Sequence, residues 1–327
     1  MLANKLNYGD TIGIVGVSNS LKYDDKYDLF YKAEQLFLDK GFKIKRGKYI
    51  FEDYYGSVGT KEQKAEDIMD MFKDKEVKAI ICLEGGETCN TFIDLLDYEV
   101  IKENPKILTG YSDVTVLLQA IYEKTGLVTF HGPNFTGYRE IVANEMYKEF
   151  ENVFINNNLE SFHSGNKKIV REGNVIGKTI GTNLGCMMYL LGTEYLPDMQ
   201  DKILLIESYK TSPNECQRRF AHLKQYGIFD KIKGVIIGYN YNLQKDGDMY
   251  PQMEDLLLEY TKEYNFPIIK CNNFGHKIVN SIIPIGVDIK INSSNQEVKI
   301  IEPFIKLWYT FLRLEIILIW LRKFIHK

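Results

Sequence analysis

Ser112 stands in the sequence context that most favours chemistry. An apolar strand pattern over residues 106–109 runs into Gly110, Tyr111 and Ser112, and a helix pattern follows at once. This order is typical of a nucleophile elbow, in which a tight turn exposes the hydroxyl and the N-terminus of the next helix stabilises a developing oxyanion. The second glycine of the usual GxSxG motif is absent, which argues against an ordinary α/β-hydrolase. Taken alone, a helix N-cap is the simpler interpretation of Ser112.

A serine hydroxyl becomes a good nucleophile only when a base takes its proton, so the histidines come next. The sequence contains five. His131 follows a strand pattern and could line a cleft, and His276 lies on a loop between two strand-like segments. The residues themselves favour neither. The other three fall in a polar connection, on a predicted helix and in the terminal tail, where we expect no catalytic role (His163, His222 and His326).

A third group must orient the imidazole of such a histidine, and Glu207 is the best candidate. It follows the apolar strand pattern of residues 203–206. Ligands of α/β sheets bind at the carboxyl ends of strands, which is where this carboxylate would lie. The alternative interpretation is a carboxylate that forms an ion pair with a nearby lysine.

A glycine pair, Gly85-Gly86, marks a second strand-to-helix junction, in the run Cys82-Leu-Glu-Gly-Gly-Glu-Thr88. Paired glycines let backbone N–H groups approach a ligand closely, so this loop could donate to an oxyanion or hold a carboxylate. The alternative is a plain helix entry that needs positive φ. Neither GxGxxG nor GxxxxGK[ST] occurs, and the five cysteines form no CxxC pair, so we expect no nucleotide cofactor and no metal.

The N-terminal part alternates strands and helices. The apolar patterns predict strands over residues 11–17, 42–45, 79–83 and 106–109, and helices over residues 24–40, 60–73, 88–96 and 114–124. Such alternation indicates right-handed βαβ crossovers and an α/β fold with a Rossmann-like, doubly wound parallel sheet.

The pattern changes between residues 142 and 173, where a helix over residues 144–154 is followed by a polar stretch. The second part mixes strands near residues 168–170, 203–206 and 235–237 with helices over 214–226 and 252–264, and it ends in a hairpin that turns at 292–295. We therefore expect an N-terminal domain over 1–150, a linker over 151–172, and a smaller mixed α/β domain over 173–302.

The composition is that of a globular protein, with 45% hydrophobic and 26% charged residues. The formal net charge of -3 provides no overall positive field for nucleic acid, so we expect none as a partner. An odd number of scattered cysteines and an N-terminus without an apolar signal segment predict a cytoplasmic location.

Both tryptophans, Trp308 and Trp320, lie in an apolar tail over residues 303–327. Arg313 and Glu315 near its middle offset the favourable transfer of its Leu, Ile and Phe residues, so we expect a helix that docks on the protein or contacts a membrane surface rather than one that spans. An aberrant end unrelated to function is the second alternative.

Taken together, these segments resemble the LD-carboxypeptidases and the related microcin C immunity proteins, a family of serine peptidases with a Ser-Glu-His triad. The resemblance runs from residue 6 to residue 302. Residues 110–115 are similar to the nucleophile segment of the family, residues 203–207 to its glutamate strand, and residues 274–286 to its histidine loop.

The resemblance implies a role for each residue. Ser112 would be the nucleophile, His276 the general base and acid, and Glu207 the group that orients His276. The backbone N–H groups of Asp113 and of the loop at residues 85–86 would form the oxyanion hole. It also implies a cleft between two domains, no cofactor, a small peptide or peptidyl-nucleotide substrate, and a homodimer.

Two departures from the family pattern bear on the substrate and on the histidine loop. Val279 stands where relatives often have proline. Glu84 stands before the glycine pair, where members that cut muropeptides usually have arginine, so the sequence favours the immunity-protein branch, which cleaves an amide that joins a peptide to a nucleotide-like group. The alternatives are a muropeptide L,D-carboxypeptidase of peptidoglycan recycling and, from another class, a non-enzymatic protein that binds a peptide or nucleotide.

Overall fold

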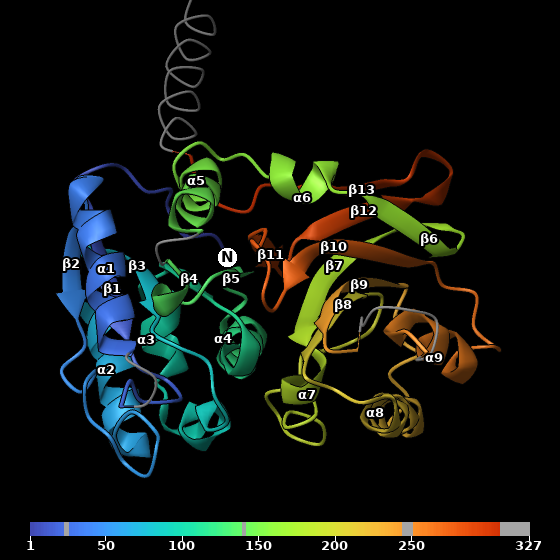
Figure 1. Ribbon diagram of the computed structural model, residues 1–327, viewed down its shortest axis with the longest axis horizontal. Coiled ribbons are helices and arrows are strands. Elements are labelled where there is room, and N and C mark those ends of the chain that lie inside the picture. Colours follow the sequence, from blue (N-terminus) through green and yellow to red (C-terminus); the bar gives the residue numbers. More distant parts are fainter. Residues whose placement is uncertain (23–25, 139–141, 244–250, 308–327) are drawn as a thin grey trace, which may run out of the picture.

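The computed structural model describes residues 1–22, 26–138, 142–243 and 251–307, and it contains two β-sheets that lie side by side (Figure 1). The N-terminal sheet has the strand order β11-β5-β4-β3-β1-β2. Its strands from the first half of the chain are all parallel. They are β1 (Thr11–Val15), β2 (Lys43–Arg46), β3 (Val77–Cys82), β4 (Ile107–Gly110) and β5 (Thr129–His131).

Helices cover both faces of this sheet, as the doubly wound prediction requires. Two helices, α1 (Lys26–Asp39) and α5 (Ala143–Phe154), bury their apolar sides in one hydrophobic cluster. Three helices bury theirs in a second cluster on the opposite face, namely α2 (Lys61–Lys73), α3 (Tyr98–Glu103) and α4 (Thr115–Thr125). The predicted α/β fold class is therefore confirmed.

The second sheet has the order β13-β12-β7-β8-β9-β10-β6, with a parallel centre and antiparallel edges. The parallel strands are β7 (Asn174–Asn183), β8 (Ile203–Tyr209), β9 (Gly234–Tyr241) and β10 (Ile268–Gly275). The antiparallel strands are β6 (Lys167–Arg171), β12 (Asp288–Asn292) and β13 (Glu297–Ile300). One face packs on α8 (Pro213–Gln225), α9 (Met253–Tyr260) and the short α7 (Leu184–Met187).

Two stretches differ from the sequence-based expectation. Residues 88–96 form two 3-10 turns, Cys89–Thr91 and Ile93–Leu95, in place of the expected helix, because side chains from other segments hold the backbone there. The segment over residues 151–172, which we expected to be a linker, contains helix α6 (Glu160–Ser164). It also contains β6, which pairs with β10 and lies where a strand was expected near residues 168–170.

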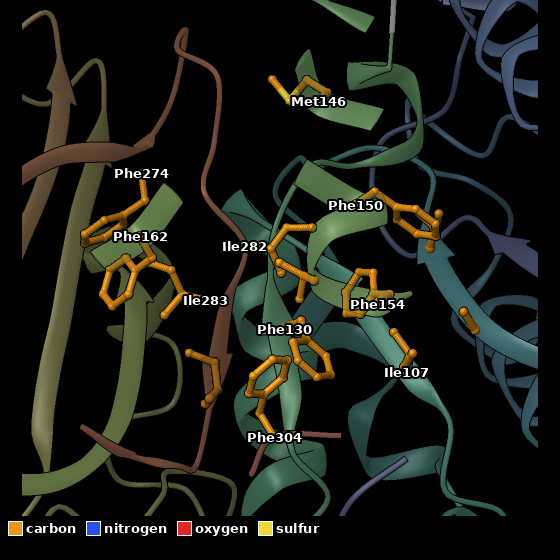
Figure 2. Packing of buried hydrophobic residues seen from close by; sticks show 14 of the residues in the cluster. Ile107, Phe130, Met146, Phe150, Phe154, Phe162, Phe274, Ile282, Ile283 and Phe304 are labelled. Carbon is orange, nitrogen blue, oxygen red and sulfur yellow. The ribbon is translucent and has the colours of Figure 1, made fainter. Parts of the chain in front are cut away.

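The hydrophobic core is continuous between the two sheets (Figure 2). Phe130 on β5 packs its ring 4.9 Å from that of Phe154 on α5 and 6.4 Å from that of Phe304. The same cluster includes Phe274 on β10 and Phe162 on α6, which belong to the second half of the chain. The two domains therefore share buried apolar surface and do not form independent units.

The start of the C-terminal tail packs on this core. Phe304 and Ile305 are buried, and the Lys306 N–H donates to the carbonyl of Ala3 at 2.8 Å. The predicted docking or surface helix falls mainly on residues 308–327, which lie outside the described residues. Within the part of the chain that is described, no helix is long and apolar enough to cross a membrane.

Strand β11 (Ile283–Ile285) links the two domains, because a segment of the C-terminal half completes the N-terminal sheet. It belongs by sequence to the last third of the chain, yet it pairs antiparallel with β5 at the edge of the N-terminal sheet. The chain then returns to the second sheet at β12.

Polar contacts between α4 and β7 fix the orientation of the domains. The side-chain amide of Gln119 donates to the carbonyl of Gly181 at 2.9 Å and accepts from its N–H at 3.2 Å. Nearby, the hydroxyls of Thr115 and Thr182 lie 2.8 Å apart. Gln119 and both threonines are fully buried, so each bond is made without competition from water.

We predict that Gln119→Leu lowers the free energy of unfolding by about 2–5 kcal/mol, because it leaves the buried N–H and C=O of Gly181 without their partner. Urea unfolding followed by circular dichroism measures the change. Gln35→Leu on the exposed side of α1 is the matched control and is expected to change stability by less than about 0.5 kcal/mol. Equal effects for the two variants would show that the Gln119 pair does not hold the interface.

Candidate active site

Ser112 lies at the sharp turn between β4 and α4, as the elbow pattern predicts. Its φ is +65°, a left-handed conformation that is uncommon for a residue other than glycine. Tyr111 before it is extended, and the Tyr111 N–H donates to the Asn134 side chain at 3.0 Å. A 3-10 turn over Ser112–Val114 then leads directly into α4. Ser112 therefore lies on the turn itself, where it lines a cavity.

An open cavity of about 930 Å³ lies over Ser112 and is bounded by both domains. Its lining residues include Ser112 from the N-terminal domain and His276 from the loop after β10. A cleft of this size matches small-molecule binding sites. The structure thus brings together Ser112 and His276, two residues that are far apart in the sequence.

His276 is held by Glu207. Its Nδ1 lies 2.7 Å from Oε2 of Glu207, which lies near the end of β8 as the strand pattern predicts. The side-chain amide of Asn183 donates to the other carboxylate oxygen at 2.8 Å. If Nδ1 carries the proton for Glu207, Nε2 is left as an acceptor for a hydroxyl in the cavity.

The Glu207 carboxylate is fully buried, yet it stays ionised. Burial opposes its charge, but the adjacent His276 and the hydrogen bonds from His276 and Asn183 outweigh that cost and lower the pKa of Glu207. Sequence reasoning did not single out Asn183. Its position at the end of β7, directly beside Glu207 in the parallel register, is the structural reason for its contact.

His131 is not the partner of Glu207. It ends β5, where it is fully buried, and its ring packs edge-on against Tyr111 at 6.0 Å and Phe274 at 5.7 Å. Burial lowers the pKa of His131 to about 4, so the ring is neutral at physiological pH. Of the two histidines that the sequence left open, His276 is the one whose ring nitrogen contacts Glu207 and whose side chain lines the cavity.

The glycine loop lies against the candidate nucleophile. A Cβ added to Gly85 would come 2.9 Å from Cβ and 3.0 Å from Oγ of Ser112. Gly86 has φ +156°, and a Cβ there would come 2.2 Å from the side chain of Asn19. Glycine at position 85 lets the loop approach Ser112 this closely, and glycine at position 86 permits the positive φ beside Asn19. A backbone oxyanion donor requires such a close approach.

The Asp113 side chain has a role that the sequence did not reveal. Its Oδ2 accepts from the Ser18 hydroxyl at 2.5 Å and from the Cys89 N–H at 2.8 Å, and Ser18 in turn accepts from the Thr88 N–H at 3.2 Å. The buried ammonium of Lys64 donates to Thr88 Oγ1 from the other side at 3.0 Å. These contacts tie the end of the glycine loop to the residue that follows Ser112.

The other three histidines lie outside the cavity or outside the described residues. His163 accepts from the Ile300 N–H at 3.0 Å and is structural, His222 is exposed on α8, and His326 lies outside the described residues. Glu84 lines the cavity, where it accepts from the Thr136 hydroxyl and lies 3.9 Å from the Lys26 ammonium. Among the described residues, no group of three or more His, Cys, Asp or Glu side chains could hold a metal ion.

Comparison with known families decides the assignment. The LD-carboxypeptidase N-terminal domain matches residues 12–132, and the LD-carboxypeptidase C-terminal domain matches residues 176–291. The chain belongs to the LD-carboxypeptidase family. The resemblance seen in the sequence is therefore confirmed.

Members of the LD-carboxypeptidase family resemble the chain over nearly its whole length. The microcin C7 self-immunity protein MccF of Escherichia coli is 29% identical over 93% of this chain and 97% of its own. The structure of MccF in complex with aspartyl sulfamoyl adenosine has a TM-score of 0.85 and 26% identity, and the match covers 94% of this chain and all of that one. Muramoyltetrapeptide carboxypeptidase from Oxalobacter formigenes shares the fold, with a TM-score of 0.75 and 21% identity over 88% and 97% of the two chains.

We predict a pH-dependent effect of His131→Gln on stability. The histidine titrates near its ordinary pKa of 6.5 in the unfolded chain and at a pKa of about 4 in the folded one, so the unfolded chain binds more protons between these values. Wild-type stability should therefore fall by about 3 kcal/mol more than that of the variant between pH 7 and pH 4. Urea unfolding across this range measures the difference, with His222→Gln as the exposed control. Parallel pH curves for wild type and His131→Gln would contradict the prediction.

Proposed function

We propose that this protein is a serine-type amide hydrolase in which Ser112, His276 and Glu207 act as the catalytic triad. The observation that carries the proposal is the buried 2.7 Å contact of Glu207 with His276, whose ring lines the same cavity as Ser112. A carboxylate, an imidazole and a hydroxyl in this order have the arrangement of a triad, which is recognised by geometry and roles rather than by fold.

In the proposed reaction, Ser112 Oγ attacks the carbonyl carbon of the substrate amide while Nε2 of His276 takes its proton. The negative charge that develops on the carbonyl oxygen is stabilised by the backbone N–H groups of Asp113 and of the loop at residues 85–86. Collapse of the tetrahedral intermediate expels the amine, which receives the proton from His276. Water, activated by His276, then attacks the acyl-enzyme in the same way and releases the acid and Ser112. Glu207 stabilises the imidazolium at each stage.

We further propose that the substrate is a small peptide cut at an amide near its C-terminal end, with an aminoacyl or peptidyl nucleotide favoured over a muropeptide. The higher TM-score to MccF, which binds aspartyl sulfamoyl adenosine, supports this choice. Glu84 supports it too, because a carboxylate in contact with Thr136 and Lys26 stands before the glycine pair, where the family resemblance leads us to expect an arginine in members that cut muropeptides.

The homodimer and the membrane-surface contact of the tail remain predictions.

Hydrolysis assays with two substrates test whether the protein belongs to the immunity-protein branch or to the muropeptide branch of the family. We expect a higher kcat/KM for aspartyl sulfamoyl adenosine than for an L,D-tetrapeptide from peptidoglycan. The opposite ranking would assign the protein to the muropeptide branch. Binding without hydrolysis of either compound, together with no labelling of Ser112 by an acylating probe, would support the non-enzymatic alternative.

We predict that Ser112→Ala lowers kcat by about 10⁴-fold or more while the protein stays folded, because the hydroxyl is the group that attacks. His276→Ala should cost a similar factor, and adding it to Ser112→Ala should cost little more. Ser164→Ala on the exposed side of α6 is the matched control and should retain kcat. Turnover by Ser112→Ala near the wild-type rate would end the triad assignment.

We also predict that Gly85→Ala lowers kcat by at least about 10²-fold, because the added methyl group meets Cβ and Oγ of Ser112 and pushes the glycine loop away from the oxyanion. Gly137→Ala introduces the same group elsewhere in the cavity, where the nearest atom, in Pro133, is 3.6 Å away, and it should cost less than about threefold. Steady-state kinetics of the two variants, with thermal unfolding as a check on folding, measure the contrast. Similar losses for both variants would contradict it.

A further inference from the structure

Two tyrosine rings flank the imidazole of His276. The ring centroid of Tyr209 lies 4.7 Å from that of His276 at an interplanar angle of 28°, and the ring of Tyr111 lies 4.8 Å away at 46°. Both side chains line the cavity with His276. Rings at these separations are in contact, so His276 is bounded by aromatic surfaces in addition to its hydrogen bond to Glu207.

The two tyrosines come from the two segments that carry the other triad residues. Tyr111 immediately precedes Ser112 in the N-terminal domain, and Tyr209 lies two residues beyond Glu207 at the end of β8 in the second domain. β8 shifts its register against β9 between Ile206 and Ser208, and such irregularities re-aim side chains next to functional sites. Each domain therefore contributes one ring to the position of the same histidine.

Each ring is itself held from behind. Tyr209 stacks on Tyr241 of the neighbouring strand β9, with centroids 5.5 Å apart and planes 12° apart. Tyr111 is fixed through its backbone N–H, which donates to Asn134, and its ring also meets the buried ring of His131. These contacts restrict the movement of both tyrosine side chains.

The hydrogen bond to Glu207 cannot orient His276 alone. One bond at Nδ1 fixes that nitrogen but lets the ring swing about the line that joins Nδ1 to Oε2 of Glu207. The backbone on both sides of His276 has positive φ, +135° at Gly275 and +65° at Lys277, so the histidine lies on a tight turn. The ring of Tyr209, stacked on the imidazole, and the ring of Tyr111, tilted against it, are placed where they would restrict this swing.

The same rings suit the charge that His276 carries during the proposed reaction. When Nε2 takes the Ser112 proton, the imidazole becomes a cation, and the negative face of an aromatic ring attracts a cation at this distance. The contacts therefore favour the protonated intermediate as well as the productive orientation.

We infer that Tyr111 and Tyr209 are positioning residues that clamp His276 between the two domains and hold its Nε2 toward Ser112. The clamp rests on the proposed triad for its catalytic consequence, but its effect on the histidine exists without any substrate. Phenylalanine preserves the aromatic faces and leucine removes them, so the chain offers a matched pair of variants at each position.

The experiment combines spectroscopy of the free protein with kinetics. Long-range ¹H–¹⁵N spectra report the tautomer of each histidine, and His276→Gln assigns the His276 signal. We expect one Nδ1-protonated tautomer in the wild type, Tyr209→Phe and Tyr111→Phe, and an averaged signal in Tyr209→Leu and Tyr111→Leu. Circular dichroism checks that each variant is folded. Tyr209 is 38% exposed, so Tyr209→Leu is expected to fold and can carry the test if Tyr111→Leu does not fold.

On a hydrolysed substrate, we expect each leucine variant to lower kcat about 10–100-fold while each phenylalanine variant stays within about threefold. A rise in KM with unchanged kcat would make Tyr209 a substrate contact and overturn the clamp. An unchanged His276 signal in both leucine variants would overturn it as well. If no substrate is hydrolysed, the spectra still decide the clamp, so its failure is distinct from failure of the proposed function.

Discussion

The site depends on a rigid contact between helix α4 and strand β7. The candidate nucleophile stands at the start of α4, and Glu207 stands on β8, the neighbour of β7, so any slip between the two elements would separate them. The paired bonds of Gln119 to Gly181 and the contact of Thr115 with Thr182 fix this junction where water cannot compete. A cleft between domains is usually a place of motion, and buried hydrogen bonds of this kind oppose such motion between α4 and β7.

The site also shows how buried charge is tolerated. Glu207 is fully buried and is compensated by His276 and Asn183, while Asp113 is compensated by the Ser18 hydroxyl and the Cys89 N–H. Burial still raises the pKa of Asp113, because none of its partners carries a full positive charge in contact with it. The two carboxylates thus do different work. Glu207 faces a base that must become charged, and Asp113 connects loops through hydrogen bonds alone.

The sequence predicted the parts of this arrangement that depend on local pattern. The elbow at Ser112, the strand that carries Glu207 and the close glycine loop are all visible as short motifs, because strand-to-helix turns demand specific residues. His276 could not be separated from His131 in this way, since the choice depends on which strands become neighbours. The turns over residues 88–96 were predicted as a helix because the pattern does not show that Asp113 and Ser18 bind the backbone there.

Strand β11 has a consequence for how the chain acquires its structure. The N-terminal sheet lacks its last strand until Ile283–Ile285 has been synthesised, so the first half of the protein leaves the ribosome with the edge of β5 unpaired. An open edge strand is a template for wrong pairing with another chain. During synthesis, the edge of β5 therefore stays unpaired until the C-terminal half has been made. A fragment cut between the domains would keep this edge unpaired permanently.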